Sequence, residues 1–263
     1  MNNAPRLPAD LHLHSSCSYD GRSSVEEMCE AALAIGLGAV AFTDHWDFDE
    51  NDPGYGRFDD EQYTALIEAA KAKFASRLVV YKGVEIDYQQ RLEGAIRDAL
   101  ADKRFDLVLG AVHYIDGTIL GPEIIADRSL EAIYATYLRE VTASARSGLF
   151  SGIAHFDYVT RYSGPNKVLW RDESLRRRLH ECLYAIIKSG AALEVNTHGL
   201  IRPPRNFYPS VELLRPYREL GGKRVTIGSD AHDKNDIGVG IAAAYAMVED
   251  LGFRAATPGT TQT

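Results

Sequence analysis

Short apolar runs recur along the chain, and most of them end in a histidine or a carboxylate. Runs of this length, bounded by polar loops, are typical of buried strands in a parallel sheet. We expect seven such strands, which cover residues 9–14, 39–45, 78–86, 107–113, 151–155, 191–196 and 224–230.

The segments between these runs carry apolar residues at helical spacing. They predict helices over residues 24–35, 59–75, 130–147, 172–189 and 209–220. The alternation favours an α/β fold in which the strands form a closed or nearly closed parallel barrel. Because right-handed crossovers place all the strand carboxyl ends on one face, the histidines should gather there. Polar loops at 46–58, after His155 and at 198–205 should border the same face.

The strongest chemical signal is the spacing of histidines and carboxylates at the strand ends. His12 and His14 are two residues apart, so a strand would point both side chains to the same side. Asp230 and His232 repeat this spacing after the last strand, which returns beside the first if the barrel closes. Glu85 lies inside an apolar run, where a carboxylate is costly unless it is paired or binds a metal. The pattern indicates a site for more than one metal ion, and hence hydrolysis.

Together these motifs resemble the polymerase and histidinol phosphatase (PHP) superfamily, and within it the histidinol-phosphate phosphatases. The resemblance is carried by Asp10-Leu11-His12-Leu13-His14 with Asp20, Thr43-Asp44-His45, Gly83-Val84-Glu85, His113, His155 and Ser229-Asp230-Ala231-His232. It implies a distorted seven-stranded (β/α)7 barrel, similar to a TIM barrel, that holds up to three divalent ions. Zinc, manganese and iron all suit such ligands, and the sequence does not choose among them.

The resemblance also implies which residues bind each ion. The ligands are His12, His14, Glu85 and Asp230 for the first ion; Glu85 again, as a bridge, with His113 and His155 for the second; and Asp20, His45 and His232 for the third. Asp44 is expected to orient a neighbouring histidine, as carboxylates behind metal ligands commonly do. For Cys17, close to the first motif, both contact with the site and ordinary packing stay open.

The function that the resemblance implies is hydrolysis of L-histidinol phosphate to L-histidinol and phosphate, a step of histidine biosynthesis. The expected nucleophile is a hydroxide that bridges two ions. Catalytic roles are expected for Asp230, His232, His45 and Arg161, and substrate contacts for Arg161, Arg202, His198 and Tyr114. The two arginines suit phosphate because a guanidinium donates two hydrogen bonds at fixed geometry.

Composition sets outer limits on these expectations. The 263 residues, 45% of them hydrophobic, predict one domain over 1–256 and a disordered tail over 257–263. No apolar stretch approaches the roughly 20 residues of a membrane span, and the start of the chain lacks a secretory signal, so we expect a cytoplasmic protein. The net charge of −8 argues against a nucleic-acid partner but not against a small anionic substrate, because bound metal ions reverse the local charge.

Two other functions stay open at this point. One is a related phosphoesterase that acts on nucleotides or other small phosphate esters. The other is a non-catalytic metal-binding module, which would be expected to lack one or more ligands, whereas the set here is complete. The sequence gives no indication of the oligomeric state.

Overall fold

A computed structural model describes residues 8–164 and 172–259 of the chain. All seven expected strands are present and lie in one parallel sheet. In sheet order they are β1 (Ala9–Leu13), β2 (Ala39–Phe42), β3 (Val79–Asp87), β4 (Leu107–Ala111), β7 (Gly152–Ile153), β8 (Ala192–Asn196) and β9 (Arg224–Gly228). An eighth strand, β10 (Arg254–Ala255), pairs with β9. The expected count of seven is therefore wrong by one, because a two-residue strand is too short to give an apolar pattern.

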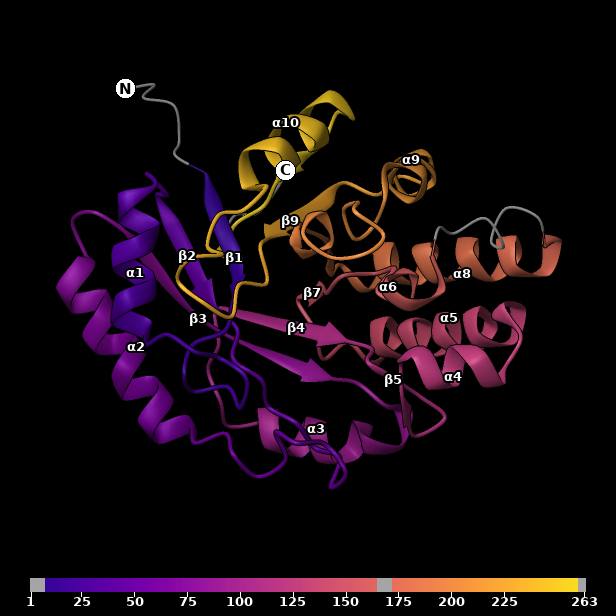
Figure 1. Cartoon of the computed structure of the whole chain (residues 1–263), viewed down its shortest axis with the longest axis horizontal. Helices are drawn as coiled ribbons and strands as arrows, with labels where there is room; N and C mark the ends of the chain where they lie inside the picture. Colours follow the sequence, from indigo (N-terminus) through magenta and orange to yellow (C-terminus); the bar gives the residue numbers. More distant parts are fainter. Residues whose placement is uncertain (1–7, 165–171, 260–263) are drawn as a thin grey trace.

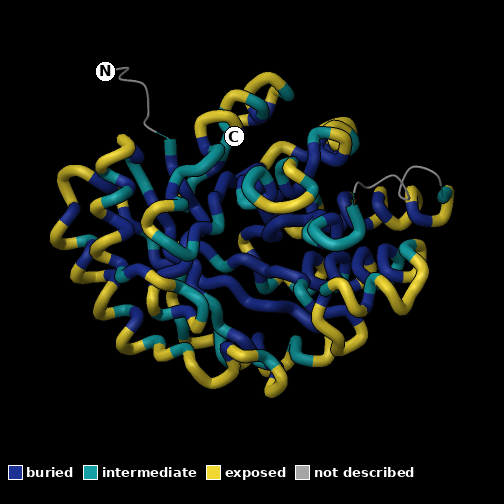
Figure 2. The backbone as a smooth tube through the Cα atoms, viewed as in Figure 1, coloured by how far each residue is buried: buried dark blue, intermediate teal, exposed yellow. Residues whose placement is uncertain are grey.

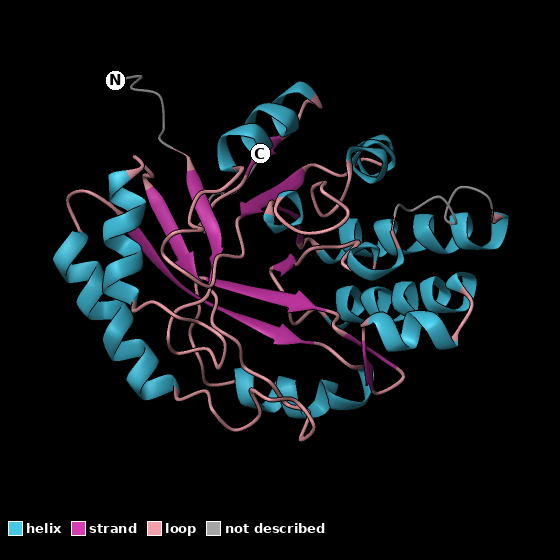
Figure 3. Ribbon diagram, in the orientation of Figure 1, coloured by secondary structure: helices cyan, strands magenta, loops and turns pink. Residues whose placement is uncertain are grey.

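The helices surround the sheet on its outer side (Figures 1 and 3). They are α1 (Val25–Ala34), α2 (Asp60–Phe74), α3 (Glu93–Leu100), α4 (Pro122–Asp127), α5 (Leu130–Ser147), α6 (Thr160–Ser163), α8 (Glu173–Ser189), α9 (Val211–Glu219) and α10 (Ile241–Asp250). Two short 3₁₀ helices, η1 (Gln90–Leu92) and η2 (His198–Leu200), and the hairpin β5 (Tyr114–Ile115) and β6 (Thr118–Ile119) complete the fold.

Capping residues explain why four of the expected helices begin within one residue of their observed start. Ser24 forms a capping box with Glu27 at the start of α1, and the side chains of Asp59, Ser129 and Asp172 accept backbone hydrogen bonds at α2, α5 and α8. The expected helix over 209–220 instead begins at Val211.

The sheet curls until its first and last long strands meet. The backbone N–H of His14 donates to Ala231 at 2.9 Å, and the N–H of Asp230 donates to His12 at 2.8 Å. At the amino end of β9, the short strand β10 pairs with it in parallel, with Arg254 opposite Arg224. Backbone bonds between β1 and the segment after β9 thus bring residues from both ends of the chain together at the carboxyl edge.

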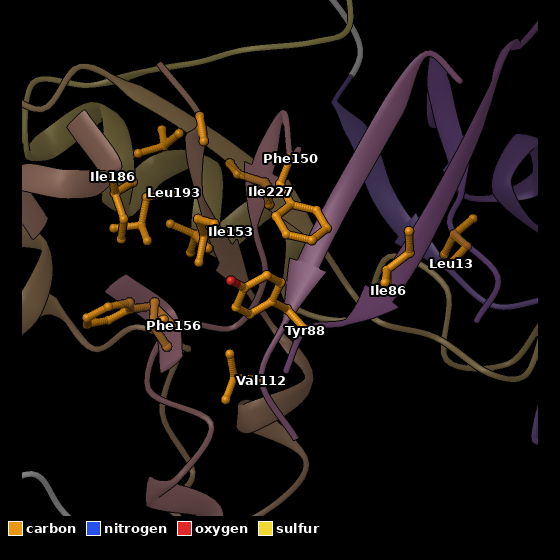
Figure 4. Packing of buried hydrophobic residues seen from close by; sticks show 14 of the residues in the cluster. Leu13, Ile86, Tyr88, Val112, Phe150, Ile153, Phe156, Ile186, Leu193 and Ile227 are labelled. Atoms are coloured by element: carbon orange, nitrogen blue, oxygen red, sulfur yellow. The ribbon is translucent and has the colours of Figure 1, made fainter. Parts of the chain in front are cut away.

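The core has two parts, one on each face of the sheet. The larger part packs strands against helices, and Figure 4 shows Ile86, Ile153 and Leu193 of the strands with Ile186 of α8 in this layer. A smaller cluster contains only residues in or next to strands: Ala9, Leu11, Ala41, Leu107, Leu109, Ala111 and Ala154. The strands are accordingly buried along most of their length, while exposed residues lie mainly on the helices and loops around them (Figure 2).

Most strands end before the histidine that the sequence places at their terminus. The strands end at Phe42, Ala111 and Ile153, so His45, His113 and His155 lie on the segments that follow, although an isolated bridge still joins His45 to Glu85 of β3. Within residues 8–164 and 172–259, no helix is long and apolar enough to cross a membrane. Of the expected disordered tail over 257–263, residues 260–263 lie outside the described residues.

Candidate metal centre and substrate pocket

The nine candidate ligands converge at the carboxyl edge of the sheet, beside a cavity of about 350 Å³. His12 and His14 are fully buried beneath it, and the other seven line it. Their donor atoms form three groups, each within 4.8 Å: His12, His14 and Asp230; Glu85, His113 and His155; and His14, His45 and His232. Asp20 joins the third group through its contact with His232.

The first group, His12, His14 and Asp230, has the spacing of a four-ligand metal site when Glu85 is added to it. Nε2 of His12 lies 2.9 Å from Nε2 of His14, and each of these atoms lies 3.4 Å from Oε2 of Glu85. Oδ1 of Asp230 is 3.4 Å from His14 and 3.7 Å from His12. Donor atoms about 2.0–2.1 Å from a tetrahedral ion lie roughly 3.3 Å from one another. The spacing of the four side chains therefore fits one divalent ion.

Glu85 joins the first group to the second. Its Oε1 lies 2.9 Å from Nε2 of His155, which is itself 3.3 Å from Nε2 of His113. One oxygen of the buried carboxylate thus faces His12 and His14 while the other faces His155. This is the geometry that the bridging role inferred from the sequence requires.

The third group lies nearer the opening of the cavity. Oδ2 of Asp20 is 3.1 Å from Nε2 of His232 and 3.8 Å from Nε2 of His45. The ring of His14 lies 4.2 Å from that of His232 and 4.3 Å from that of His45, centroid to centroid, so His14 borders two groups. The second oxygen of Asp20 is buried and has no hydrogen-bond partner among the described residues. A cation at this position would satisfy it.

Hydrogen bonds to the second ring nitrogen fix how several imidazoles face the cavity. Nδ1 of His12 lies 2.7 Å from Glu194, Nδ1 of His14 lies 3.2 Å from Ser18 Oγ, and Nδ1 of His232 lies 2.9 Å from the carbonyl of Asp230. A proton held on Nδ1 leaves the lone pair on Nε2, and in all three rings Nε2 points into the cluster. These hydrogen bonds therefore orient the three rings so that Nε2 is available to bind a metal ion.

Glu194 is a functional candidate that the sequence reasoning missed. It lies on β8, is 1% exposed, and accepts hydrogen bonds from His12 and from the backbone N–H of His155 at 2.9 Å. Gly228 leaves room for this contact, because a Cβ there would lie 2.3 Å from Cβ of His12 and 2.8 Å from Glu194. The sequence did hold a signal, since Glu194 interrupts an apolar strand as Glu85 does.

We expect Glu194→Gln to weaken metal binding by about 10- to 100-fold, the range for partners that orient metal ligands. A glutamine oxygen could stand in for only one of the two carboxylate oxygens, and the amide N–H₂ would face a donor at the position of the other. Competition with a chelator, read out as bound metal per chain, measures the change. Glu181→Gln, on the exposed face of α8, is the matched control. Unchanged metal affinity in Glu194→Gln would contradict this role.

Burial and neighbouring charges shift the pKa of several candidate ligands. Burial, with the imidazoles of His232 and His45, lowers the pKa of His14 to about 3, and burial with His155 lowers that of His113 to about 3. Burial alone would lower the pKa of His232, but its hydrogen bond to Asp20 and the charge of Asp230 raise it to about 9. Near neutral pH, His14 and His113 therefore offer free lone pairs, whereas His232 must release a proton to bind a metal.

Two of the ligands occupy unusual backbone conformations. His155 has φ of 24° and Asp230 has φ of 57°, in the region that residues other than glycine seldom adopt. Each residue lies two positions after the end of its strand, at Ile153 for His155 and at Gly228 for Asp230. Backbone strain of this kind costs about 1–3 kcal/mol per residue and is concentrated at functional sites.

Arginines line one side of the cavity, above the metal groups. Arg161, from α6, packs against Tyr158 and Tyr162 with its guanidinium 5.5 and 5.7 Å from the ring centroids. Nε of Arg202 donates to Nε2 of His198 at 3.2 Å. Within the described part of the chain, neither arginine forms an ion pair with a carboxylate. Both guanidinium groups therefore have donors left for an anion.

The other expected substrate residues divide between the cavity and its surroundings. His198 lines the cavity and its Nδ1 lies 3.1 Å from the carbonyl of Asp230. Tyr114 is not among the lining residues; it is buried behind Asp52, to which its hydroxyl donates at 3.0 Å. Arg22 lines the cavity although its sequence context gave no signal.

Carboxylates that the sequence reasoning did not single out occupy the loop after β2. Asp47 and Asp52 both line the cavity, and Asp47 is only 6% exposed. Burial, with the charges of Asp52 and Asp87, raises the pKa of Asp47 to about 9. The loop at 46–58 was expected to border this face, but which of its side chains turn inward depends on its folded path.

Comparisons with known proteins agree with this geometry. The PHP domain model matches residues 10–198. The chain belongs to the PHP domain family. It is 34% identical over 255 residues to a probable histidinol-phosphatase of Deinococcus radiodurans, covering 94% of this chain and 95% of that protein. It is 29% identical to a histidinol-phosphatase of Lactococcus lactis, over 93% of this chain and 91% of that protein.

A solved structure shares the architecture of this PHP domain. The histidinol phosphate phosphatase of Lactococcus lactis, in complex with zinc, L-histidinol and phosphate, superposes with a TM-score of 0.82 at 26% identity. The match covers 94% of this chain and 95% of that one. The curled parallel sheet described above is therefore the fold of a known phosphatase.

Two further residues of the PHP domain are Asp44, expected to orient a neighbouring histidine, and Cys17, whose contacts the sequence left open. Asp44 bonds no imidazole among the described hydrogen bonds; it accepts from the backbone N–H groups of Ser15 at 2.7 Å and Ser18 at 3.0 Å. It supports His14 only indirectly, because Ser18 Oγ contacts His14 Nδ1. Cys17 packs against the core and is not among the residues that line the cavity.

Proposed function

We propose that this PHP domain is a metal-dependent phosphomonoesterase that hydrolyses L-histidinol phosphate to L-histidinol and phosphate. The observation that carries the proposal is the convergence of three groups of metal-ligand atoms and two unpaired arginines on one cavity. The names of the relatives at up to 34% identity, and the zinc, histidinol and phosphate in the related structure, support the same substrate. Zinc, manganese and iron are the candidate metals.

The side chains divide the work of this reaction between them. The ligands of the inner ions would be His12, His14, Glu85, Asp230, His113 and His155, and those of the outer ion would be Asp20, His45 and His232. Such ions polarise the phosphoryl group and lower the pKa of water when they are bound. Among the ligands Asp20 and His232 are the most exposed, at 33% and 25%, so the third group lies close to where a substrate would enter. Arg161 and Arg202 would orient the phosphate by charge-assisted hydrogen bonds.

A substrate panel tests the proposal directly. We expect the metal-loaded protein to release phosphate from L-histidinol phosphate with a kcat/KM at least about tenfold above that for AMP or an aryl phosphate. A higher kcat/KM for AMP would instead favour a nucleotide phosphoesterase. No turnover of any of the three, in protein that holds its metals, would favour a non-catalytic module. A cytoplasmic location and the absence of a nucleic-acid partner stay predictions.

We expect Arg161→Ala to raise KM for L-histidinol phosphate at least about tenfold, because a charge-assisted phosphate contact stabilises the complex by more than about 1.4 kcal/mol. Arg161 binds no ion in any of the three groups, so bound metal per chain should stay the same. Arg177→Ala, on the exposed face of α8, is the control. Unchanged kinetics would remove Arg161 from the site.

A further inference from the structure

Arginines and carboxyl groups line the cavity from different segments of the chain. Arg161 and Arg202 come from α6 and from the segment after η2, whereas Asp47 and Asp52 come from the loop after β2. Neither aspartate belongs to the three groups of metal-ligand atoms. We call Asp47 and Asp52 the acidic wall. Asp233 and Asp236 also line the cavity, but of these four aspartates only Asp47 is buried. Phosphate chemistry needs the arginines and the metals, but it gives no reason for a buried carboxyl group outside the metal groups.

Asp47 is buried in the cavity wall without a partner. The residue is 6% exposed, and its Oδ2 atom has no hydrogen bond among the described residues. The loop folds tightly around it, because a Cβ on Gly54 would lie 2.1 Å from that oxygen. A buried carboxylate oxygen without a partner is costly, so the position calls for a donor that the chain itself does not provide.

Asp52 is held in place beside it. Its Oδ2 accepts from the hydroxyl of Tyr114 at 3.0 Å, and its Oδ1 accepts from the N–H of Gly54 at 2.7 Å. Within the described part of the chain, neither aspartate of the acidic wall forms an ion pair. Asp49, in the same loop, pairs with Arg91. Arg91 of η1 thus pairs with one carboxylate of this loop, whereas Asp47 and Asp52 line the cavity without an ion pair among the described residues.

We propose that the acidic wall binds the primary ammonium group of the substrate, and so selects phosphate esters of amino alcohols. This inference rests on the proposed function, since L-histidinol phosphate carries its amine on the carbon next to the phosphate-bearing carbon. With the phosphate at the arginines and metals, the amine would face the acidic wall. The same ester without the amine would leave the buried carboxyl group of Asp47 without a partner, which is how polar sites reject such analogues.

The test compares L-histidinol phosphate with 3-(imidazol-4-yl)propyl phosphate, which differs only by lacking the amine. We expect Asp47→Asn and Asp52→Asn each to lower kcat/KM for L-histidinol phosphate about thirtyfold, as for the loss of one partner of a buried charge pair. For the analogue the change should stay below about threefold. Glu50→Gln, an exposed carboxylate of the same loop, should alter neither value. The affinity of metal-loaded protein for L-histidinol, measured by calorimetry, should fall in parallel.

Three results would overturn the inference. One is an equal loss of kcat/KM for both esters, which would mean that the aspartates act on the phosphate or on the fold. Another is a fall in bound metal per chain in the variants, which would make the acidic wall a cation site. The third is unchanged selectivity in folded variants with normal melting temperatures. If the wild-type protein fails to hydrolyse L-histidinol phosphate, the proposed function itself is wrong, and that result is seen before any variant is made.

Discussion

Glu85→Gln is expected to lower kcat/KM for L-histidinol phosphate about a thousandfold. Glu85 is 1% exposed, and its two oxygens face different groups, at 3.4 Å from His12 and His14 and at 2.9 Å from His155. A glutamine has one oxygen, and its amide nitrogen cannot bind a metal. Removing one member of a buried charged cluster costs about 3–5 kcal/mol, and each 1.36 kcal/mol of barrier is a factor of ten in rate.

Two measurements separate the causes of this loss. Steady-state kinetics give the loss of rate, and metal analysis of the same preparation should show fewer ions per chain than in the wild-type protein. Glu68→Gln, on the exposed face of α2, removes a carboxylate of equal size and should leave both values unchanged. A Glu85→Gln protein with full metal content and full activity would show that no ion depends on this carboxylate.

Removal of the metals is expected to abolish phosphate release and to lower the melting temperature. The three groups place imidazole and carboxylate donors within 4.8 Å of one another, and an ion that binds only the folded chain stabilises it by mass action. At a metal concentration 100 times the Kd this is about 2.7 kcal/mol, or roughly 5 °C for a domain of this size. Melting curves and kinetics of chelated protein, before and after zinc, manganese or iron is returned, measure both effects.

The same titration should depend on pH in a defined direction. The pKa of His232 is raised to about 9, so near neutral pH this imidazole holds a proton that a metal must displace. Metal affinity at the outer group should therefore rise as the pH increases toward about 9, with proton release on binding. His14 and His113, with pKa values near 3, should contribute no such dependence over this range. Full activity in metal-free protein would refute the metal-dependent reaction.

Local patterns were enough to predict the strands, whereas the full metal-ligand set came from the resemblance to the PHP superfamily. Apolar runs end close to His12, His45, His113 and His155, and a parallel fold has to bring such ends to one edge. The starts of four helices could also be predicted, because capping depends on residues three or fewer positions apart. The helix α10 was missed because four of its ten residues are alanine, which weakens the contrast between its faces.

Contacts between distant segments were beyond prediction. Glu194 meets His12 across 182 positions of sequence, and only the curl of the sheet shows that β9 alone separates β8 from β1. The acidic wall depends on a loop without regular structure, so spacing in the sequence does not reveal that Asp47 turns inward while Asp49 pairs with Arg91. Tyr114 follows a ligand histidine directly, yet it is buried behind Asp52.

The sequence by itself determined which residues could bind metals and at which edge of the sheet they would lie. The apolar runs and the polar residues at their ends are local features of the sequence, and any parallel α/β fold places such strand ends at one edge of the sheet. The resemblance to the PHP superfamily already implied how the ligands divide among three ions, with Glu85 as the bridge. Only the tertiary structure decided that Glu194 supports His12 and His155 and which loop carboxylates line the cavity. Those features depend on distances of a few ångströms between segments far apart in the chain, and such distances are set by packing.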